Sequence, residues 1–219
     1  MTEHDIFARL SEHGVVPVIT ITDRDLAVPL ARAMMGGGLP VAEITFRTPG
    51  AADVVATLKQ ECPDLILGAG TVLSIQDLSL ARENGAQFAV APGLNPEIVE
   101  EAHRLGLPFA PGVATPTEIE RALGLGARVL KFFPAEASGG PAMLRALAGP
   151  YSHLGVKFVP TGGVNSSNLE AYLSLDAVLC VGGSWVARKD IIAAKKWHEI
   201  RQNCREVRQL VAWIRGNAD

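Results

Sequence analysis

The amino-acid sequence predicts an α/β fold in which eight parallel strands and their helices close into a (β/α)8 TIM barrel. Eight short apolar runs recur at intervals of about 20 to 28 residues, the length of one strand–helix unit. Each run is almost continuously apolar, as expected for strands buried on both faces of a parallel sheet. The predicted strands are Val15–Ile21, Val41–Phe46, Leu65–Gly70, Gln87–Ala91, Pro108–Val113, Val129–Phe133, Lys157–Pro160 and Ala177–Val181.

Helices are predicted between these strands, where apolar residues are spaced by three and four. Residues 3–13 form an extra N-terminal helix before the first strand, and residues 188–215 form a long closing helical region. Asn95, Thr115 and Asn165 stand where helices need a side-chain N-cap, and glycines follow several of the helices.

The length of the chain favours one domain. A barrel of this kind often exceeds 200 residues, so residues 1–219 are expected to form a single domain. An open doubly wound sheet is the alternative. It is disfavoured because Thr22, Asp23 and Arg24 follow the first strand, where a dinucleotide-binding sheet carries a GxGxxG turn.

Composition limits the partners of the protein. A formal net charge of −3 without a cluster of Lys and Arg argues against nucleic acid, and no apolar stretch is long enough to cross a membrane. Cys62, Cys180 and Cys204 are far apart and form no CxxC pair, which indicates reduced thiols. The N-terminal segment does not resemble a signal peptide, so we expect a cytoplasmic protein.

Lys131 stands in the middle of a predicted buried strand, Val129–Phe133. Burying an ammonium group is costly unless the group is neutralised or paired. Loss of water also favours the neutral amine, which attacks carbonyl groups. The structural alternative is a lysine whose stem packs on apolar neighbours and whose ammonium reaches solvent. The central position in the strand favours the functional interpretation.

The second predicted strand places Glu43, Thr45 and Arg47 on one face, because side chains alternate along a strand. A structural salt bridge is one interpretation. Two opposite charges that point into the mouth of a barrel favour a functional one. Arg47 has the fork that binds a substrate carboxylate, and Glu43 is able to transfer protons.

Glycines and a hydroxyl follow other strands. Thr71 comes directly after Gly68–Gly70 and offers a hydrogen-bonding group at the rim, although such a turn is common. The pairs Gly162–Gly163 and Gly182–Gly183 follow the predicted seventh and eighth strands, where barrels of this type bind phosphate. A helix that starts at Asn165–Ser167 adds an N-terminus that favours anions.

The histidines argue against a metal. All five fall in helical or loop segments, and none stands at a strand end or at the spacing of metal ligands. We therefore expect neither a metal nor a cofactor. The histidines are His4, His13, His103, His153 and His198.

A nucleophilic amine, an acid beside an arginine and an anion cradle suit a keto acid with a phosphate at its far end. A Schiff base turns the carbonyl into an electron sink, so a neighbouring C–C bond breaks without a metal. The blocks that carry these groups are Glu43–Thr48, Gly68–Val72, Lys131–Glu136, Pro160–Gly163 and Gly182–Trp185. In them, and from Val15 to about Val186 as a whole, the sequence resembles the 2-keto-3-deoxy-6-phosphogluconate (KDPG) aldolases. The block Lys-Phe-Phe-Pro-Ala-Glu is highly specific.

The resemblance implies that Lys131 forms the Schiff base and that Glu43 transfers protons. It also implies a homotrimer, a place in the Entner–Doudoroff pathway, and cleavage of the phosphorylated keto acid to pyruvate and glyceraldehyde 3-phosphate. Substrate contacts are implied for Arg47 and Thr71 at the pyruvyl end, Pro92 and Phe133 in the pocket wall, Thr161 at the aldehyde half, and Gly162, Gly163, Gly182, Gly183 and Ser184 around the phosphate.

Other functions remain open on the sequence alone. The same site could cleave 4-hydroxy-2-oxoglutarate (KHG), whose far end is a carboxylate, or 2-dehydro-3-deoxy-6-phosphogalactonate, which differs at one hydroxyl. A phosphate-binding barrel isomerase or synthase would use no covalent step. A barrel that senses a sugar phosphate without turnover is disfavoured, because every polar group at the rim is present.

Overall fold

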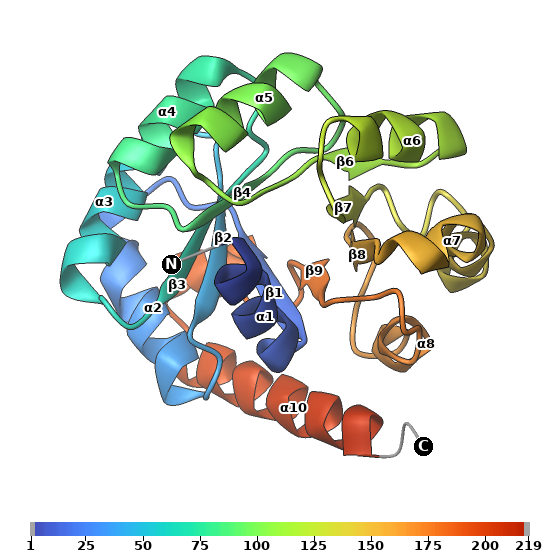
Figure 1. Cartoon of the computed structure of the whole chain (residues 1–219). Helices are drawn as coiled ribbons and strands as arrows, with labels where there is room; N and C mark the ends of the chain where they lie inside the picture. Colours follow the sequence, from blue (N-terminus) through green and yellow to red (C-terminus); the bar gives the residue numbers. More distant parts are fainter. Residues whose placement is uncertain (1–2, 217–219) are drawn as a thin grey trace.

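The computed structural model describes residues 3–216 and has the predicted barrel architecture, with strands at the centre and helices around them (Figure 1). The strands are β1 (Val15–Ile19), β2 (Val41–Thr45), β3 (Ile66–Gly70), β4 (Phe88–Val90), β5 (Phe109–Ala110), β6 (Gly112–Val113), β7 (Val129–Phe132), β8 (Lys157–Pro160) and β9 (Val181–Gly183). The helices are α1 (Glu3–His13), α2 (Ala27–Gly36), α3 (Ala51–Glu61), α4 (Ile75–Glu83), α5 (Pro96–Leu105), α6 (Pro116–Gly124), α7 (Gly140–Ala148), α8 (Leu169–Leu173), α9 (Lys189–Ala193) and α10 (Trp197–Gly216). Two short 3₁₀ helices are η1 (Arg24–Leu26) and η2 (Gly149–Leu154).

The strands form a closed parallel ring in two hydrogen-bonded sheets. One sheet has the order β5-β4-β3-β2-β1-β9 and the other β6-β7-β8, and every pair is parallel. Bridges from Phe158 to Val178 and from Thr161 to Gly182 join β8 to the β9 region. All positions of β2 and β3 are buried, as predicted for a parallel sheet covered on both faces.

The fifth predicted strand, Pro108–Val113, is two short strands instead of one. Pro111 separates β5 from β6, because proline has no backbone N–H to donate to the ladder. Its carbonyl still accepts a hydrogen bond from the N–H of Lys131, at 2.8 Å. The barrel therefore keeps eight strand positions, and the one formed by β5 and β6 is interrupted where it lies beside Lys131.

The eighth predicted strand, Ala177–Val181, begins too early. The structure forms β9 from Val181 to Gly183, and the residues before it make a turn in which the N–H of Val178 donates to the carbonyl of Leu175. Apolar character is shared by the turn and the strand, so hydropathy does not separate them. As a result, Gly182 and Gly183 lie inside the strand rather than after it.

Two helix predictions are corrected. The helix predicted to start at Asn165–Ser167 starts at Leu169, because the side chain of Asn165 accepts hydrogen bonds from the N–H and the hydroxyl of Ser167 and so forms a local turn. The closing region 188–215 is two helices, α9 and α10. Lys195 separates them with a φ of 54°, a left-handed conformation that ends a helix.

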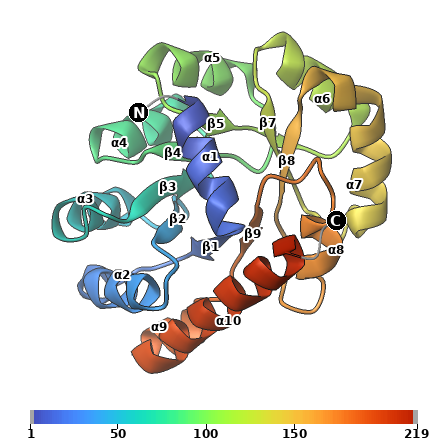
Figure 2. The same cartoon turned by 60° about the horizontal axis from the view of Figure 1, so that its bottom comes forward.

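Helix α1 covers one end of the barrel. It leads through Gly14 directly into β1, so it lies at the N-terminal ends of the strands, and Ile6, Phe7 and Leu10 are buried beneath it. Figure 2 shows α1 crossing in front of the strands at this end. In barrels of this type, functional side chains gather at the opposite end, where the C-terminal ends of the strands lie.

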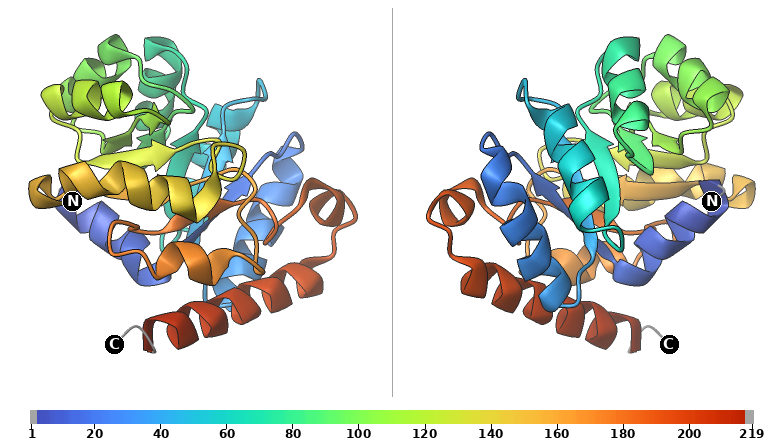
Figure 3. Two further views of the ribbon diagram at one scale, coloured as in Figure 1. Left: turned by 90° about the vertical axis from the view of Figure 1, so that its right-hand side faces the viewer. Right: turned by 90° about the vertical axis from the view of Figure 1, so that its left-hand side faces the viewer.

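Helix α10 runs along one side of the molecule and packs against α2 and α8 (Figure 3). Its side chains Arg208 and Arg215 donate to the carbonyl of Glu12, near the C-terminal end of α1, where the helix dipole favours positive charge. Within residues 3–216, no helix has both the length and the apolar character that crossing a membrane requires.

We predict that Gly68→Ala destabilises the barrel. An added Cβ on Gly68 would lie 2.1 Å from the ring of Phe88, which is buried in the core, and such overpacking costs about 1–3 kcal/mol. Urea unfolding measures the loss. Gly124→Ala is the matched control, since nothing lies within 4 Å of a Cβ there, and its free energy of unfolding should not fall. Equal stability of the two variants would contradict the prediction.

Candidate active site

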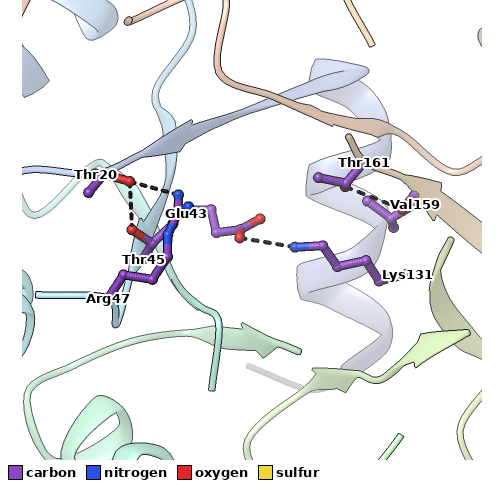
Figure 4. Close-up of polar contacts among 7 residues, drawn as sticks. All are labelled: Thr20, Glu43, Thr45, Arg47, Lys131, Val159 and Thr161. Carbon is purple, nitrogen blue, oxygen red and sulfur yellow. Dashed lines mark hydrogen bonds and ion pairs between the residues drawn. The ribbon is translucent and has the colours of Figure 1, made fainter. Parts of the chain in front are cut away.

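An ion pair inside the barrel joins Lys131 to Glu43. Lys131 lies on β7 and Glu43 on β2, and the side-chain nitrogen Nζ is 3.2 Å from Oε1 of the carboxylate. The lysine is 5% exposed and the glutamate 3%. The two residues are 88 positions apart in the chain, and Figure 4 shows their side chains pointing toward each other. The ammonium thus lies inside the barrel and does not reach its outer surface.

A glycine on the neighbouring strand provides the space for the carboxylate. Gly70 ends β3, and a Cβ added to it would lie 2.0 Å from Oε1 of Glu43. Any larger residue at this position would push the carboxylate away from Lys131. The ring of Phe133 lies on another side of the lysine, with its centroid 5.8 Å from Nζ, a geometry in which an aromatic face attracts a cation.

Arg47 is held at the rim by a pair of hydroxyls. Its Nη2 donates to Oγ1 of Thr20 at 2.7 Å, and this hydroxyl shares a further hydrogen bond of 2.9 Å with Oγ1 of Thr45. Figure 4 shows the three side chains gathered beside Glu43. Sequence reasoning did not single out Thr20. A polar residue near the end of the otherwise apolar run 15–21 was the signal that could have found it.

A hollow of about 160 Å³ opens at the C-terminal ends of the strands and contains eight of the predicted substrate-binding residues. Val18 and Val164, which were not predicted, also line it. Pro92 lines a separate hollow with Val72, and Thr71 lines neither of these two hollows. The predicted residues in the first hollow are Arg47, Phe133, Thr161, Gly162, Gly163, Gly182, Gly183 and Ser184.

Thr71 nevertheless has an unusual backbone. Its φ of 57° is in the left-handed region, which residues with a side chain seldom adopt, and the residue follows directly on β3. Strained conformations of this kind are concentrated at functional sites.

The glycine turn after β8 lines the hollow. Gly162 and Gly163 have φ values of 98° and 86°, and their carbonyls accept hydrogen bonds from the N–H of Glu136 and the side-chain amide of Asn165. Among the residues that the structure describes, none accepts a hydrogen bond from the N–H groups of Gly163 or Val164. Successive unpaired amides form a concavity that binds anions.

Other nucleophiles are poorly placed. Cys62, Cys180 and Cys204 are free and buried. Burial raises the pKa of Cys180 and of Cys204 to about 12, so both thiols are protonated at neutral pH. Burial likewise raises the pKa of Cys62.

The histidines are dispersed over the helices. His13 ends α1, His103 lies on α5, His153 on η2 and His198 on α10, whereas the side chain of His4 lies outside the described part. Burial, followed by the charge of Arg208, lowers the pKa of His13. Within the described residues, no group of three or more His, Cys, Asp or Glu side chains could hold a metal ion.

Comparison with known proteins identifies the family of this chain. The family model for KDPG and KHG aldolases matches residues 6–203. The 2-dehydro-3-deoxy-phosphogluconate aldolase of Treponema pallidum is 47% identical over 206 residues, which cover 94% of this chain and 97% of that protein. The enzyme of the same name from Haemophilus influenzae is 44% identical over 210 residues, covering 96% and 98%.

Solved structures agree. A KDPG aldolase from Legionella pneumophila, crystallised with pyruvate captured as a covalent carbinolamine, has a TM-score of 0.89 at 40% identity, covering 94% of this chain and 98% of that one. A Zymomonas mobilis KDPG aldolase with 3-phosphoglycerate has a TM-score of 0.82 at 38% identity, covering 93% of each chain. Since a family model spans most of the chain and relatives above 40% identity cover over nine-tenths of it, the chain belongs to the KDPG and KHG aldolase family.

Proposed function

We propose that this protein is a class I aldolase, a lyase that cleaves KDPG to pyruvate and glyceraldehyde 3-phosphate through a Schiff base. The observation that carries the proposal is the buried pair of Lys131 and Glu43, with Nζ and Oε1 3.2 Å apart. It places an amine and an acid–base group within hydrogen-bonding distance in a site with little access to water.

The first stage joins the substrate to the enzyme. Lys131 transfers a proton to Glu43 and attacks the C2 ketone of the keto acid with its neutral amine, which gives a carbinolamine. Glu43, directly or through a water molecule, returns the proton to the C2 hydroxyl, which leaves as water. The product is a protonated imine at C2, which attracts the electrons of a neighbouring bond.

The second stage breaks the C3–C4 bond. Glu43, again a carboxylate, removes the proton of the C4 hydroxyl, directly or through water. The C3–C4 electrons move into the imine to form an enamine, and C4 becomes the aldehyde of glyceraldehyde 3-phosphate. Glu43 gives this proton to C3, directly or through water, and water hydrolyses the imine to release pyruvate and restore Lys131.

Arg47 is the proposed partner of the substrate carboxylate. Its guanidinium is already oriented by Thr20, so little side-chain entropy is lost when it binds. Thr71 assists at the pyruvyl end, Pro92 and Phe133 form the wall, and Thr161 contacts the aldehyde half. The phosphate is assigned to Gly162, Gly163, Gly182, Gly183 and Ser184.

We further propose a homotrimer that acts in the Entner–Doudoroff pathway of the cytoplasm. Leu73, Ile75 and Leu80 are large apolar side chains with exposures of 61%, 44% and 37%, and exposed apolar groups of this kind are typical of interfaces. The free cysteines fit a reducing compartment. Sedimentation equilibrium tests the assembly, and a mass near 23.2 kDa at micromolar concentration would refute it.

Lys131→Ala should abolish turnover, because the variant has no amine to form the Schiff base. Borohydride reduction in the presence of pyruvate, followed by mass spectrometry, should label Lys131 in the unaltered protein and nothing in the variant. Lys157→Ala, which changes an exposed lysine on the neighbouring strand β8, is the control. It should retain turnover and the labelling of Lys131. Labelling of a different residue would indicate another nucleophile. Turnover without any labelling would indicate a non-covalent isomerase.

Glu43→Gln should lower kcat by about two to four orders of magnitude, the range for loss of a general acid–base group. The amide keeps nearly the same shape but does not accept the proton of Lys131 or of the C4 hydroxyl. Steady-state kinetics with KDPG measures the effect. Full activity of this variant would remove Glu43 from the mechanism.

Cleavage of KHG or of 2-dehydro-3-deoxy-6-phosphogalactonate is the alternative function. The glycine turn favours a dianionic phosphate over a carboxylate, so we expect kcat/KM to be highest for a phosphorylated substrate. Measuring kcat/KM for KDPG, KHG and the phosphogalactonate with one preparation tests this order. A higher kcat/KM for KHG than for KDPG would indicate that KHG is the physiological substrate.

A further inference from the structure

Glu136 ends the Lys-Phe-Phe-Pro-Ala-Glu block but has no part in the chemistry described above. It lies beyond β7, alongside the glycine turn that follows β8. The N–H of Ala135 donates to the carbonyl of Thr161 at 2.8 Å, and the N–H of Glu136 donates to the carbonyl of Gly162 at 3.0 Å. These two bonds fix the carbonyls of Thr161 and Gly162 against the segment 135–136.

The side chain of Glu136 also supports the turn. A Cβ added to Gly163 would lie 2.6 Å from both Cβ and Cγ of Glu136, so the stem of the glutamate lies directly against this glycine. The φ of Gly163, 86°, is the conformation that orients its N–H, and any shift of the glutamate stem would change the space available to it. The position of Glu136 therefore affects the shape of the anion-binding turn.

Tyr172 fixes that position from the other side. It is a fully buried residue of α8, and its hydroxyl donates a hydrogen bond to Oε1 of Glu136. Burial and this hydrogen bond raise the pKa of Tyr172 above its ordinary value, so the hydroxyl remains a donor across the neutral range. Helix α8 follows the glycine turn, and Glu136 precedes it in the chain. The Tyr172–Glu136 bond thus joins the segments on both sides of the turn.

We propose that Glu136 and Tyr172 are positioning residues that hold the turn Gly162–Gly163 in its anion-binding conformation and so determine affinity for the phosphate end of the substrate. The inference rests on the proposed function for the identity of the substrate. The proposal assigns different roles to two groups of residues. Glu136 and Tyr172 control phosphate binding, whereas Lys131 and Glu43 control the covalent steps.

The chain offers a matched control for a purely structural role. Tyr151 is also buried, and its hydroxyl donates to Oε1 of Glu120 at 3.2 Å, between η2 and α6. Neither residue lines the hollow that contains the glycine turn. Removing this second hydroxyl tests what loss of a part-buried tyrosine–glutamate bond does to stability alone.

The experiment compares Tyr172→Phe, Glu136→Gln and Tyr151→Phe with the unaltered full-length chain. Three quantities are measured: kcat and KM for KDPG, the dissociation constant of inorganic phosphate by titration calorimetry, and the rate of borohydride trapping with pyruvate. Circular dichroism and thermal unfolding report the folded state of each variant.

Tyr172→Phe should raise KM for KDPG and the dissociation constant of inorganic phosphate about ten-fold, the effect of one hydrogen bond to a charged group. The values of kcat and of pyruvate trapping should stay within about two-fold, because binding and not chemistry is weakened. Glu136→Gln should act in the same direction and less strongly, since the amide oxygen still accepts a hydrogen bond. Tyr151→Phe should change none of these quantities.

The proposal is overturned if Tyr172→Phe lowers thermal stability but leaves phosphate binding unchanged, or if kcat and pyruvate trapping fall as much as phosphate affinity. If Tyr172→Phe does not fold, Glu136→Gln decides the question alone, and unchanged phosphate binding in that variant refutes the proposal. Failure of the proposed function has a different signature. The unaltered chain would then trap no pyruvate, while the phosphate titrations would still test the role of the pair.

Discussion

The buried ion pair of Lys131 and Glu43 is the constraint on which the rest of the site depends. Both groups lose nearly all contact with water, and in a protein interior such a pair is seldom more stable than apolar residues of the same size. Losing either partner leaves an uncompensated charge, at a cost of about 3–5 kcal/mol. Stability therefore does not explain the pair, whereas the proposed reaction uses it to move a proton between an amine and an acid.

Missing side chains create the space that this pair and its neighbours occupy. A Cβ on Gly70 would lie 2.0 Å from the carboxylate of Glu43, and one on Gly182 would lie 2.4 Å from the hydroxyl of Thr161. In each case a polar side chain occupies the room left by a glycine on the adjoining strand. A barrel of eight strands has an interior just wide enough for packed side chains, so polar groups fit there only where a neighbour is reduced to backbone.

In the proposed function, the two ends of the substrate are bound by different kinds of groups. At the pyruvyl end the proposed partner is the charged side chain of Arg47, which a hydrogen bond to Thr20 orients. At the phosphate end the proposed partners are backbone amides of the turn Gly162–Gly163, whose carbonyls are bonded to Glu136 and Asn165. Amides cannot be changed by substitution without changing the turn itself, so this end depends on the residues that support it.

Apolar runs, glycines and the position of Lys131 within a strand were sufficient to predict a parallel barrel and its N-terminal helix, because strand periodicity and burial are local properties of the chain. The residues predicted around the substrate came in part from the resemblance to a family, and eight of them line one hollow. Local patterns did not predict that Pro111 divides a strand, that Asn165 forms a turn, or that Pro92 lines a different hollow. Lys131 and Glu43 come within 3.2 Å of each other only because the strands close into a barrel. Distances between residues 88 positions apart depend on how all the strands pack, and no local pattern contains them.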